Sequence, residues 1–358
     1  MKFLILAVLL STEVLWAANA PTKINLYALD SKFITVNNKD QAVVLSNLNK
    51  AMKQMSGGVL DLPVSIGLII PQTYDSPFFD PMALTLVAPY QMVIDGRSKN
   101  PVFTRGVELH EFGHAIFNEN MELVLKKQPA LLKRWNSAKK IISKTAVNRA
   151  KILKRDLLSE MLSKKAEAIK AQPSSPIMIE LDELSLTLQD EESKLMSVYS
   201  DNQMIIQELG ELFQALTPYN EFFADVVSVV ITEDPQSVAN ALHFSNHKSI
   251  PYEDRSFERR RSKRPVDGTP HNFYSLSRNY IYKYYLSNPI YKAKGKAWLI
   301  RKGLDSVTCG INNQEKLVEK LTVEAEEILK KNPRFDVQKF AIEKMNAGLD
   351  LCIDQIFQ

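Results

Sequence analysis

The chain contains 358 residues, of which 45% are hydrophobic and 24% are charged, and its formal net charge is +4. These values are typical of a globular protein. So small a net charge on so long a chain predicts no nucleic-acid partner.

Residues 1–20 resemble a secretory signal peptide. Lys2 supplies a positive start, residues 3–10 are an uninterrupted apolar run, and Ala-Asn-Ala at 18–20 fits a signal-peptidase site. The run is much shorter than the roughly twenty residues that a membrane span needs. We therefore predict cleavage after Ala20, a secreted or periplasmic protein, and no stable membrane span in the mature chain.

Residues 21–119 are predicted to form an N-terminal lobe with a small mixed sheet. Runs typical of strands occupy 23–29, 33–37, 64–70 and 83–94, and residues 39–55 have the pattern of a helix. Residues 84–93 are the candidate for an edge strand that would hold an extended peptide by main-chain hydrogen bonds. An interior strand fits this segment equally well.

Residues 107–117 form an apolar, helix-compatible segment that contains His110, Glu111 and His114, and Thr104 is its predicted N-cap. In a helix, His110 and His114 lie one turn apart on the same face. Two imidazoles so placed can bind one zinc ion and leave Glu111 beside the open coordination position. The alternative is a helix whose histidines only cap or pack.

The segment 120–218 is predicted to be a long antiparallel helical hairpin, a coiled-coil-like arm. Apolar residues recur every three or four positions from 129 to 172 and again from 177 to 216, with the turn Pro-Ser-Ser-Pro at 173–176. The first arm is strongly basic and the second strongly acidic, so the two attract each other when folded back. We expect the outer half, residues 145–202, to project and to be dispensable for the core. A protein partner at the hairpin is left open.

Downstream, Glu221 and Asp225 stand one helical turn apart among apolar residues. A buried carboxylate needs a partner, because burying an unpaired charge is costly. A zinc ion would satisfy Glu221, and Asp225 would then accept a hydrogen bond from the far nitrogen of a ligand histidine.

His110-Glu111-x-x-His114, followed by Asn220-Glu221-x-x-Ala224-Asp225, resembles the gluzincin metallopeptidases of the thermolysin and neprilysin kind. The resemblance covers about a dozen positions in two helices. It implies that Glu221 is the third zinc ligand, that Asp225 orients a ligand histidine, and that one Zn²⁺ is bound per chain. The interval 115–220 is longer than in thermolysin-like enzymes.

Residues 267–274 contain a third candidate group. His271, with Asp267 before it, resembles the Asp-supported histidine that stabilises the oxyanion in thermolysin-like enzymes, and Tyr274 is the alternative donor. The competing interpretation is a loop histidine packed on tyrosines. Just upstream, the basic run from Arg255 to Arg264 is interpreted as a solvated loop, and His243 with His247 as ordinary histidines.

Residues 219–358 are predicted to form a mostly helical C-terminal lobe, with helices at 312–331 and 337–346. Cys309 and Cys352, the only cysteines, are predicted to form one disulfide, because an even count in an exported protein favours a bridge. Two buried free thiols are the alternative.

The predicted fold is therefore α+β, with a zincin-like core, an inserted hairpin and a helical C-terminal lobe. The predicted function is zinc-dependent hydrolysis of peptide bonds, by an endopeptidase rather than an exopeptidase, with Glu111 as the general base and His271 stabilising the oxyanion. Two alternatives remain open at this point. One is an exported, non-catalytic adaptor in which zinc joins the two lobes, and the other is a zinc amidase acting on cell-wall amides.

Overall fold

The computed structural model describes residues 25–28, 38–55, 60–71, 77–90, 93, 101–171, 175–195, 199–244, 255–258 and 269–358. The predicted signal peptide, the predicted strand at 33–37, and Asp267 and His247 lie outside these ranges.

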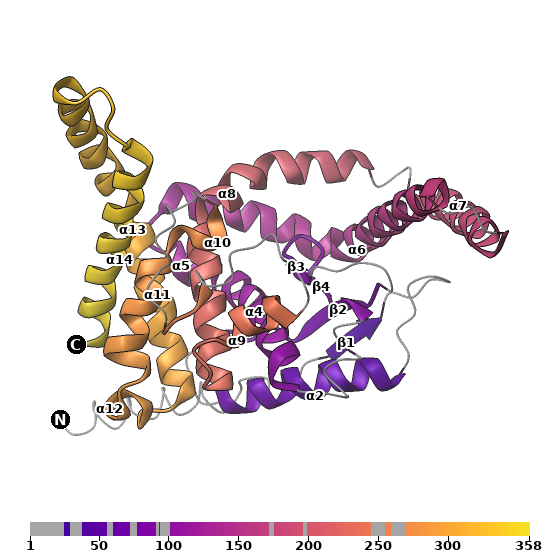
Figure 1. Ribbon diagram of the computed structural model, residues 1–358, viewed down its shortest axis with the longest axis horizontal. Helices are drawn as coiled ribbons and strands as arrows, with labels where there is room; N and C mark the ends of the chain where they lie inside the picture. Colours follow the sequence, from indigo (N-terminus) through magenta and orange to yellow (C-terminus); the bar gives the residue numbers. More distant parts are fainter. Residues whose placement is uncertain are drawn as a thin grey trace, which may run out of the picture.

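Within the described ranges, four short strands form one mixed sheet near the N-terminus (Figure 1). Their order is β1-β2-β4-β3, in which β1 (Asn25–Ala28), β2 (Ser65–Ile69) and β4 (Thr85–Val87) run parallel. The fourth strand, β3 (Phe78–Asp80), pairs antiparallel with β4. The rest of the described chain is mostly helical, so the broad α+β prediction is confirmed.

The helices account for most of the chain. In chain order they are α2 (Asn38–Met55), α4 (Pro101–Glu119), α5 (Met121–Val124), α6 (Pro129–Ala171), α7 (Ser175–Leu195), α8 (Tyr199–Thr232), α9 (Ser237–Phe244), α10 (Pro270–Phe273), α11 (Ser275–Ile281), the π-helical turn Tyr282–Leu286, α12 (Pro289–Lys292), α13 (Lys296–Lys331) and α14 (Val337–Phe357).

The strand that contacts α4 is β3. Of the two interpretations of residues 84–93, the interior strand is correct for Thr85–Val87. Thr85–Val87 lies between β2 and β3, and the chain reverses through a tight turn at residues 81–84. Asp80 Oδ1 accepts hydrogen bonds from the amides of Met82 and Ala83, both at 2.8 Å, which fixes this turn. With only three residues next to two prolines, β3 is too short for periodicity to reveal.

The two faces of the sheet are covered by different helices. Ile66, Leu68 and Leu86 belong to the main hydrophobic core, together with the apolar faces of α2 and α4. Ile69 and Val87, which point to the other face because strand side chains alternate, belong to a second cluster with α6 and α7. A strand that is buried on both faces usually consists of a continuous run of apolar residues. Residues 66–69 form such a run, with one glycine in it.

The predicted hairpin is made of three helices and packs on the sheet. Figure 1 shows α6 passing over the strands. Leu157 and Met161 of α6 share the second cluster with Leu184 and Leu188 of α7, so α7 returns antiparallel along the outer part of α6. Leu157, Leu158 and Met161 of α6 share this cluster with Ile69 and Val87, so this part of α6 packs on the sheet. That residues 145–202 can be replaced without loss of the core stays a prediction, which this packing argues against.

The helix α8 returns along the inner part of α6 and then continues into the core. Trp135 of α6 meets Phe213 of α8, with ring centroids 6.4 Å apart. The predicted boundary between 218 and 219 falls inside this helix, at Pro218. Likewise, α4 begins at Pro101, so Thr104 is not its N-cap. Proline is favoured at a first helical position because its missing N–H has no intrahelical partner there.

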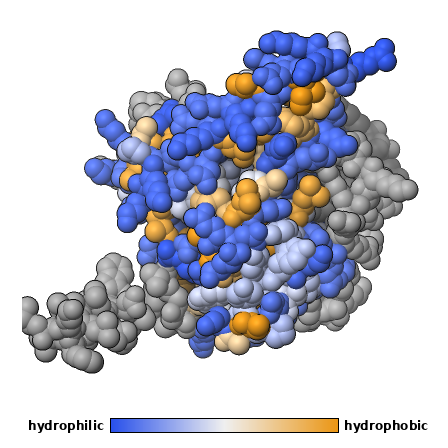
Figure 2. All heavy atoms as spheres, turned by 90° about the vertical axis from the view of Figure 1, so that its left-hand side faces the viewer, coloured by the Kyte–Doolittle hydropathy of each residue, from blue (hydrophilic) through white to orange (hydrophobic). Residues whose placement is uncertain are grey.

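The C-terminal helices α13 and α14 pack against each other and are joined by the Cys309–Cys352 disulfide, as predicted. The face that these helices present is mainly hydrophilic, with hydrophobic side chains as separated spots (Figure 2). Isolated apolar residues of this kind are ordinary on a protein surface. None of the described helices is both long enough and apolar enough to cross a lipid bilayer.

The packing of α6 on the sheet can be tested with a matched pair of substitutions. Leu158 is fully buried in the second cluster, whereas Val147 on the same helix is 55% exposed. Leu158→Ala should lower the free energy of unfolding by about 2–5 kcal/mol, and Val147→Ala should change it by no more than about 0.5 kcal/mol. Denaturant unfolding followed by circular dichroism measures both, and equal effects would mean that the hairpin is independent of the sheet.

Candidate metal centre

The site residues that the sequence predicts on α4 and α8 lie where these two helices cross. At this crossing Gly113 faces Ala224: a Cβ atom on Gly113 would lie 2.6 Å from the Ala224 Cα. Since real Cβ atoms do not approach a backbone atom this closely, only glycine fits. The small residues inside the two sequence motifs are thus the contact point of the two helices, and the polar residues beside them face each other.

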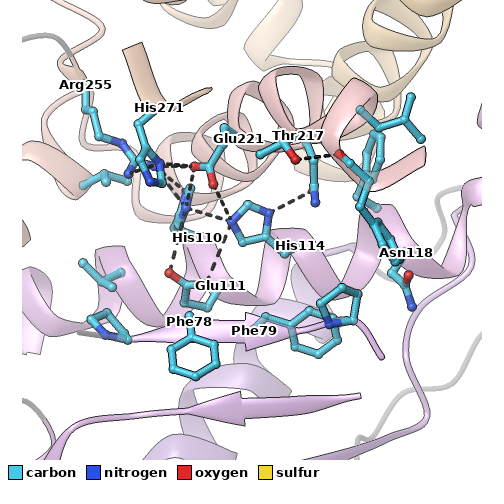
Figure 3. A pocket seen from close by; sticks show the side chains of 18 of the residues that line it. Phe78, Phe79, His110, Glu111, His114, Asn118, Thr217, Glu221, Arg255 and His271 are labelled. Atoms are coloured by element: carbon cyan, nitrogen blue, oxygen red, sulfur yellow. Dashed lines mark hydrogen bonds and ion pairs between the residues drawn. The ribbon is translucent and has the colours of Figure 1, made fainter. Parts of the chain in front are cut away.

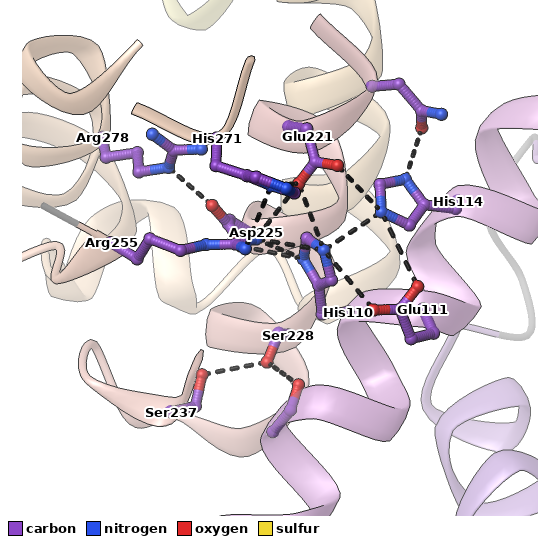
Figure 4. Close-up of polar contacts among 12 residues, drawn as sticks. His110, Glu111, His114, Glu221, Asp225, Ser228, Ser237, Arg255, His271 and Arg278 are labelled. Atoms are coloured by element: carbon purple, nitrogen blue, oxygen red, sulfur yellow. Dashed lines mark hydrogen bonds and ion pairs between the residues drawn. The ribbon is translucent and has the colours of Figure 1, made fainter. Parts of the chain in front are cut away.

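His110, His114 and Glu221 converge at this crossing (Figure 4). The Nε2 atoms of His110 and His114 are 3.0 Å apart. The Glu221 carboxylate lies 3.3 Å from His110 Nε2 and 3.6 Å from His114 Nε2. Ligands about 2.0–2.1 Å from a tetrahedral zinc ion are roughly 3.3 Å from one another. The three side chains therefore have the spacing of one metal's ligands.

The other ring nitrogen of each histidine is held by a residue next to Glu221. His110 Nδ1 lies 2.8 Å from Asp225 Oδ1, and His114 Nδ1 lies 2.9 Å from Asn220 Oδ1. With Nδ1 donating to these oxygens, Nε2 of each ring is left as the atom that faces Glu221. The sequence predicted this hydrogen bond for Asp225 but no role for Asn220.

Glu111 is buried beside the three converging donors but stands farther away. Its oxygens are 3.9 Å from both histidine Nε2 atoms, somewhat farther than those of Glu221. Burial raises the pKa of Glu111 to about 7, helped by Glu221 and opposed by His110 and Arg255. A carboxyl group with this pKa can both accept and donate a proton near neutral pH.

The pKa values of the remaining residues reflect burial set against neighbouring charge. Burial lowers the pKa of His114 to about 4, so this imidazole is neutral at pH 7, the form that binds metal. For His110, burial and Arg255 favour the neutral form, but Asp225 and Glu221 outweigh them and raise the pKa to about 9. Although burial alone would raise the pKa of Glu221, His114, His110 and His271 hold it well below its usual range.

Two arginines balance the buried carboxylates. Arg255 Nη2 lies 2.7 Å from Asp225 Oδ1 and 3.2 Å from Glu221 Oε2. The Nε of Arg278, a fully buried residue of α11, donates to the other Asp225 oxygen at 2.6 Å. Burial alone would raise the pKa of Asp225, but these two cations and His110 hold it far below its usual range. The sequence did not reveal either arginine, since Arg255 is one of several basic residues and Arg278 has no motif around it.

His271 lies at the rim of the group rather than within it. Its Nδ1 is 2.8 Å from Glu221 Oε2 and 3.3 Å from Arg255 Nη1, and its side chain is 51% exposed. Tyr274, the predicted alternative donor, is buried between Tyr219 and Phe222 and does not line the cavity described next. Of these two residues, only His271 can reach a ligand in that cavity.

A cavity of about 370 Å³ opens onto this group (Figure 3). Its polar lining includes the converging donors, Glu111, Arg255 and His271. Apolar side chains from three elements also line it: Phe79 of β3, Phe117 near the end of α4, and Phe213 and Leu216 of α8. The cavity therefore combines a polar centre with apolar walls.

Comparisons with protein-family models, with curated proteins and with solved structures found no match. The geometry alone therefore supports the following statement: His110, Glu111 and His114 form a buried group that could hold a metal ion.

The close contact at Gly113 predicts that alanine substitutions at two glycines have different effects on metal affinity. Gly113→Ala should push α4 away from Ala224, separate the donors, and reduce metal affinity by at least tenfold, as disturbance of the residues that orient metal ligands does. Gly210→Ala, on α8 where nothing lies within 4 Å, should leave affinity unchanged and stabilise the helix by up to about 1 kcal/mol. Competition with a metal-chelating dye measures the affinities, and unaltered binding by the Gly113 variant would remove the crossing from the explanation.

Proposed function

We propose that the protein is a zinc-dependent peptidase whose metal is held by His110, His114 and Glu221. The observation that carries this proposal is the convergence of two imidazole nitrogens and one carboxylate, 3.0–3.6 Å apart, in a buried site. Two histidines and one glutamate, with a fourth position open, are a ligand set of catalytic zinc. The resemblance of both motifs to the gluzincins supports the same conclusion.

A zinc ion bound by these donors would lower the pKa of a water molecule and polarise a peptide carbonyl group. The residues around it have separate tasks. Glu111, with its pKa raised to about 7, accepts a proton from the attacking water and returns it to the leaving amine. Arg255 and His271 line the same cavity and can donate hydrogen bonds to the substrate carbonyl as negative charge develops on its oxygen.

The edge strand β3 gives the cavity a surface suited to a peptide. β3 lies at the edge of the sheet, and both Phe79 and Glu111 line the cavity, so this strand borders the proposed base. An extended peptide can add to an exposed strand through main-chain hydrogen bonds. A purely structural zinc site would be closed by four protein ligands, whereas this group opens onto a cavity.

We also propose that the protein works outside the cytoplasm. The motif at residues 1–20 supports export. The Cys309–Cys352 disulfide supports it independently, since stable disulfides form mainly in oxidising compartments.

The metal assignment predicts one zinc per chain and its loss in selected variants. His110→Ala and Glu221→Ala should each abolish zinc retention after dialysis, because a site left with two protein ligands binds weakly. His271→Ala is the matched control and should retain zinc, since that residue is not among the proposed ligands. Elemental analysis of the purified variants gives the stoichiometry, and full zinc content in the Glu221 variant would falsify its role.

The role of Glu111 predicts a variant that keeps the metal and loses turnover. Glu111→Gln has the same shape but cannot take up the proton, so kcat should fall by about a hundredfold or more. The exposed Glu326 of α13 provides the control, because Glu326→Gln should leave kcat unaltered. Cleavage of a fluorogenic peptide library measures both, and wild-type turnover by the Glu111 variant would place the chemistry elsewhere.

A further inference from the structure

Asn118 is a buried polar residue of the cavity that the proposed chemistry does not use. It is 7% exposed, lines the cavity, and follows His114 by one turn of α4, on the same face. Its Oδ1 has no hydrogen-bond partner among the residues that the structure describes. Buried side-chain amides are normally bonded, so an orphaned one requires an explanation.

Asn120, two residues later, provides a comparison, because its side-chain amide makes structural hydrogen bonds. Its Oδ1 accepts from the Asp61 amide at 3.1 Å, and its Nδ2 donates to the carbonyls of Asp61 and Ile116, both at 2.8 Å. Asn120 therefore connects the backbone at Asp61 to the end of α4. Asn118 is 7% exposed, and its Oδ1 makes no such bond among the described residues, so this oxygen does not hold segments of the fold together.

The surroundings of Asn118 narrow the class of ligand. Figure 3 shows Asn118 and Arg255 at opposite sides of the cavity, with the histidines between them. The charged side chains that line the cavity, Glu111, Glu221 and Arg255, lie 3.0–3.9 Å from His110, two turns of α4 away from Asn118. The lining also includes Phe117, which precedes Asn118, and the rings of Phe79 and Phe213. Burying a cationic or anionic side chain there would cost free energy, because no opposite charge is available to pair with it. The pocket therefore suits a neutral, largely apolar group.

The ligand group must also carry a polar atom that can form a hydrogen bond with the side-chain amide of Asn118. A hydroxyl can both donate and accept, so it pairs with Asn118 whichever way the amide is turned. Four helical residues separate Asn118 from His114, a rise of about 6 Å, which an extended aromatic side chain spans. A phenol meets both requirements: its ring packs on apolar walls, and its hydroxyl reaches a partner when buried.

We propose that the part of the cavity at Asn118 is a subsite for a tyrosine side chain next to the scissile bond, with Asn118 as the residue that selects tyrosine over phenylalanine. The proposal rests on the peptidase function proposed above and names its substrate class. Where the Phe residues supply affinity for any ring, Asn118 supplies the discrimination. A site with a buried polar group disfavours a substrate that leaves this group unpaired.

The test compares peptides that are identical except for Tyr, Phe or Lys at the residue on either side of the cleaved bond. Zinc-loaded protein carrying Glu111→Gln should turn over about a hundredfold or more slowly, so Kd values from calorimetry, with the peptide checked for cleavage afterwards, report the subsite separately from catalysis. We expect the Tyr peptide to bind about tenfold more tightly than the Phe peptide, and the ratio of kcat/KM in the wild-type protein to match. Asn118→Leu should bring both ratios to about one.

Two further variants separate recognition from folding. Asn118→Leu should keep its zinc and should not lower Tm, because it removes an unpaired buried amide. Asn120→Ala should lower Tm through its lost hydrogen bonds and keep the Tyr-to-Phe ratio. Equal Kd values for the Tyr and Phe peptides, a preference for Lys, or a Tyr preference that survives in Asn118→Leu would each overturn the subsite. A Tyr preference in Kd without any cleavage by the wild-type protein would instead refute the peptidase function and leave the subsite standing.

Discussion

The contact between Gly113 and Ala224 is the constraint on which the candidate site depends. Because no side chain separates α4 from α8 at this point, residues on the facing sides come within hydrogen-bonding distance. Asn220, Glu221 and Asp225 then meet His114 and His110 as a set. The proposed ligands and the residues bonded to them come from just two helices, and a site built on helices is held more precisely than one built on loops.

Charge balance extends the site beyond this pair of helices. Glu111, Glu221 and Asp225 are all buried and lie 2.8–3.9 Å from the His110 ring nitrogens, and buried carboxylates are stable only when paired. The compensating cations, Arg255 and Arg278, come from the segment after α9 and from α11. The segment after α9 and the helix α11 therefore complete this group electrostatically, although the proposed ligands precede them in the sequence. The same two arginines keep Asp225 ionised, so it can hold His110 in one orientation.

The sequence predicted the parts of this centre that depend on fixed spacing. His110 and His114 are one turn apart in any helix, and the same holds for Glu221 and Asp225. It could not predict contacts that arise only when distant segments pack. Arg255 is one member of a basic run, β3 is too short to show a period, and Asn118 becomes exceptional only once its amide is seen without a partner. Periodicity likewise predicted long helices at 129–216, but not that Leu158 would cover the sheet.

The continuity of α8 links the long insertion to the chemistry. Phe213 and Leu216, on the returning part of the hairpin, line the cavity, and Glu221 follows on the same helix after Pro218. A proline inside a helix removes one backbone hydrogen bond and bends the axis, and the Thr217 hydroxyl donates to the Phe213 carbonyl at 2.6 Å beside it. The two motifs thus supply polar residues of the cavity lining, while the returning part of the hairpin supplies apolar ones. Substitutions at Phe213 or Leu216 can therefore change which side chain is accepted without changing the proposed metal ligands.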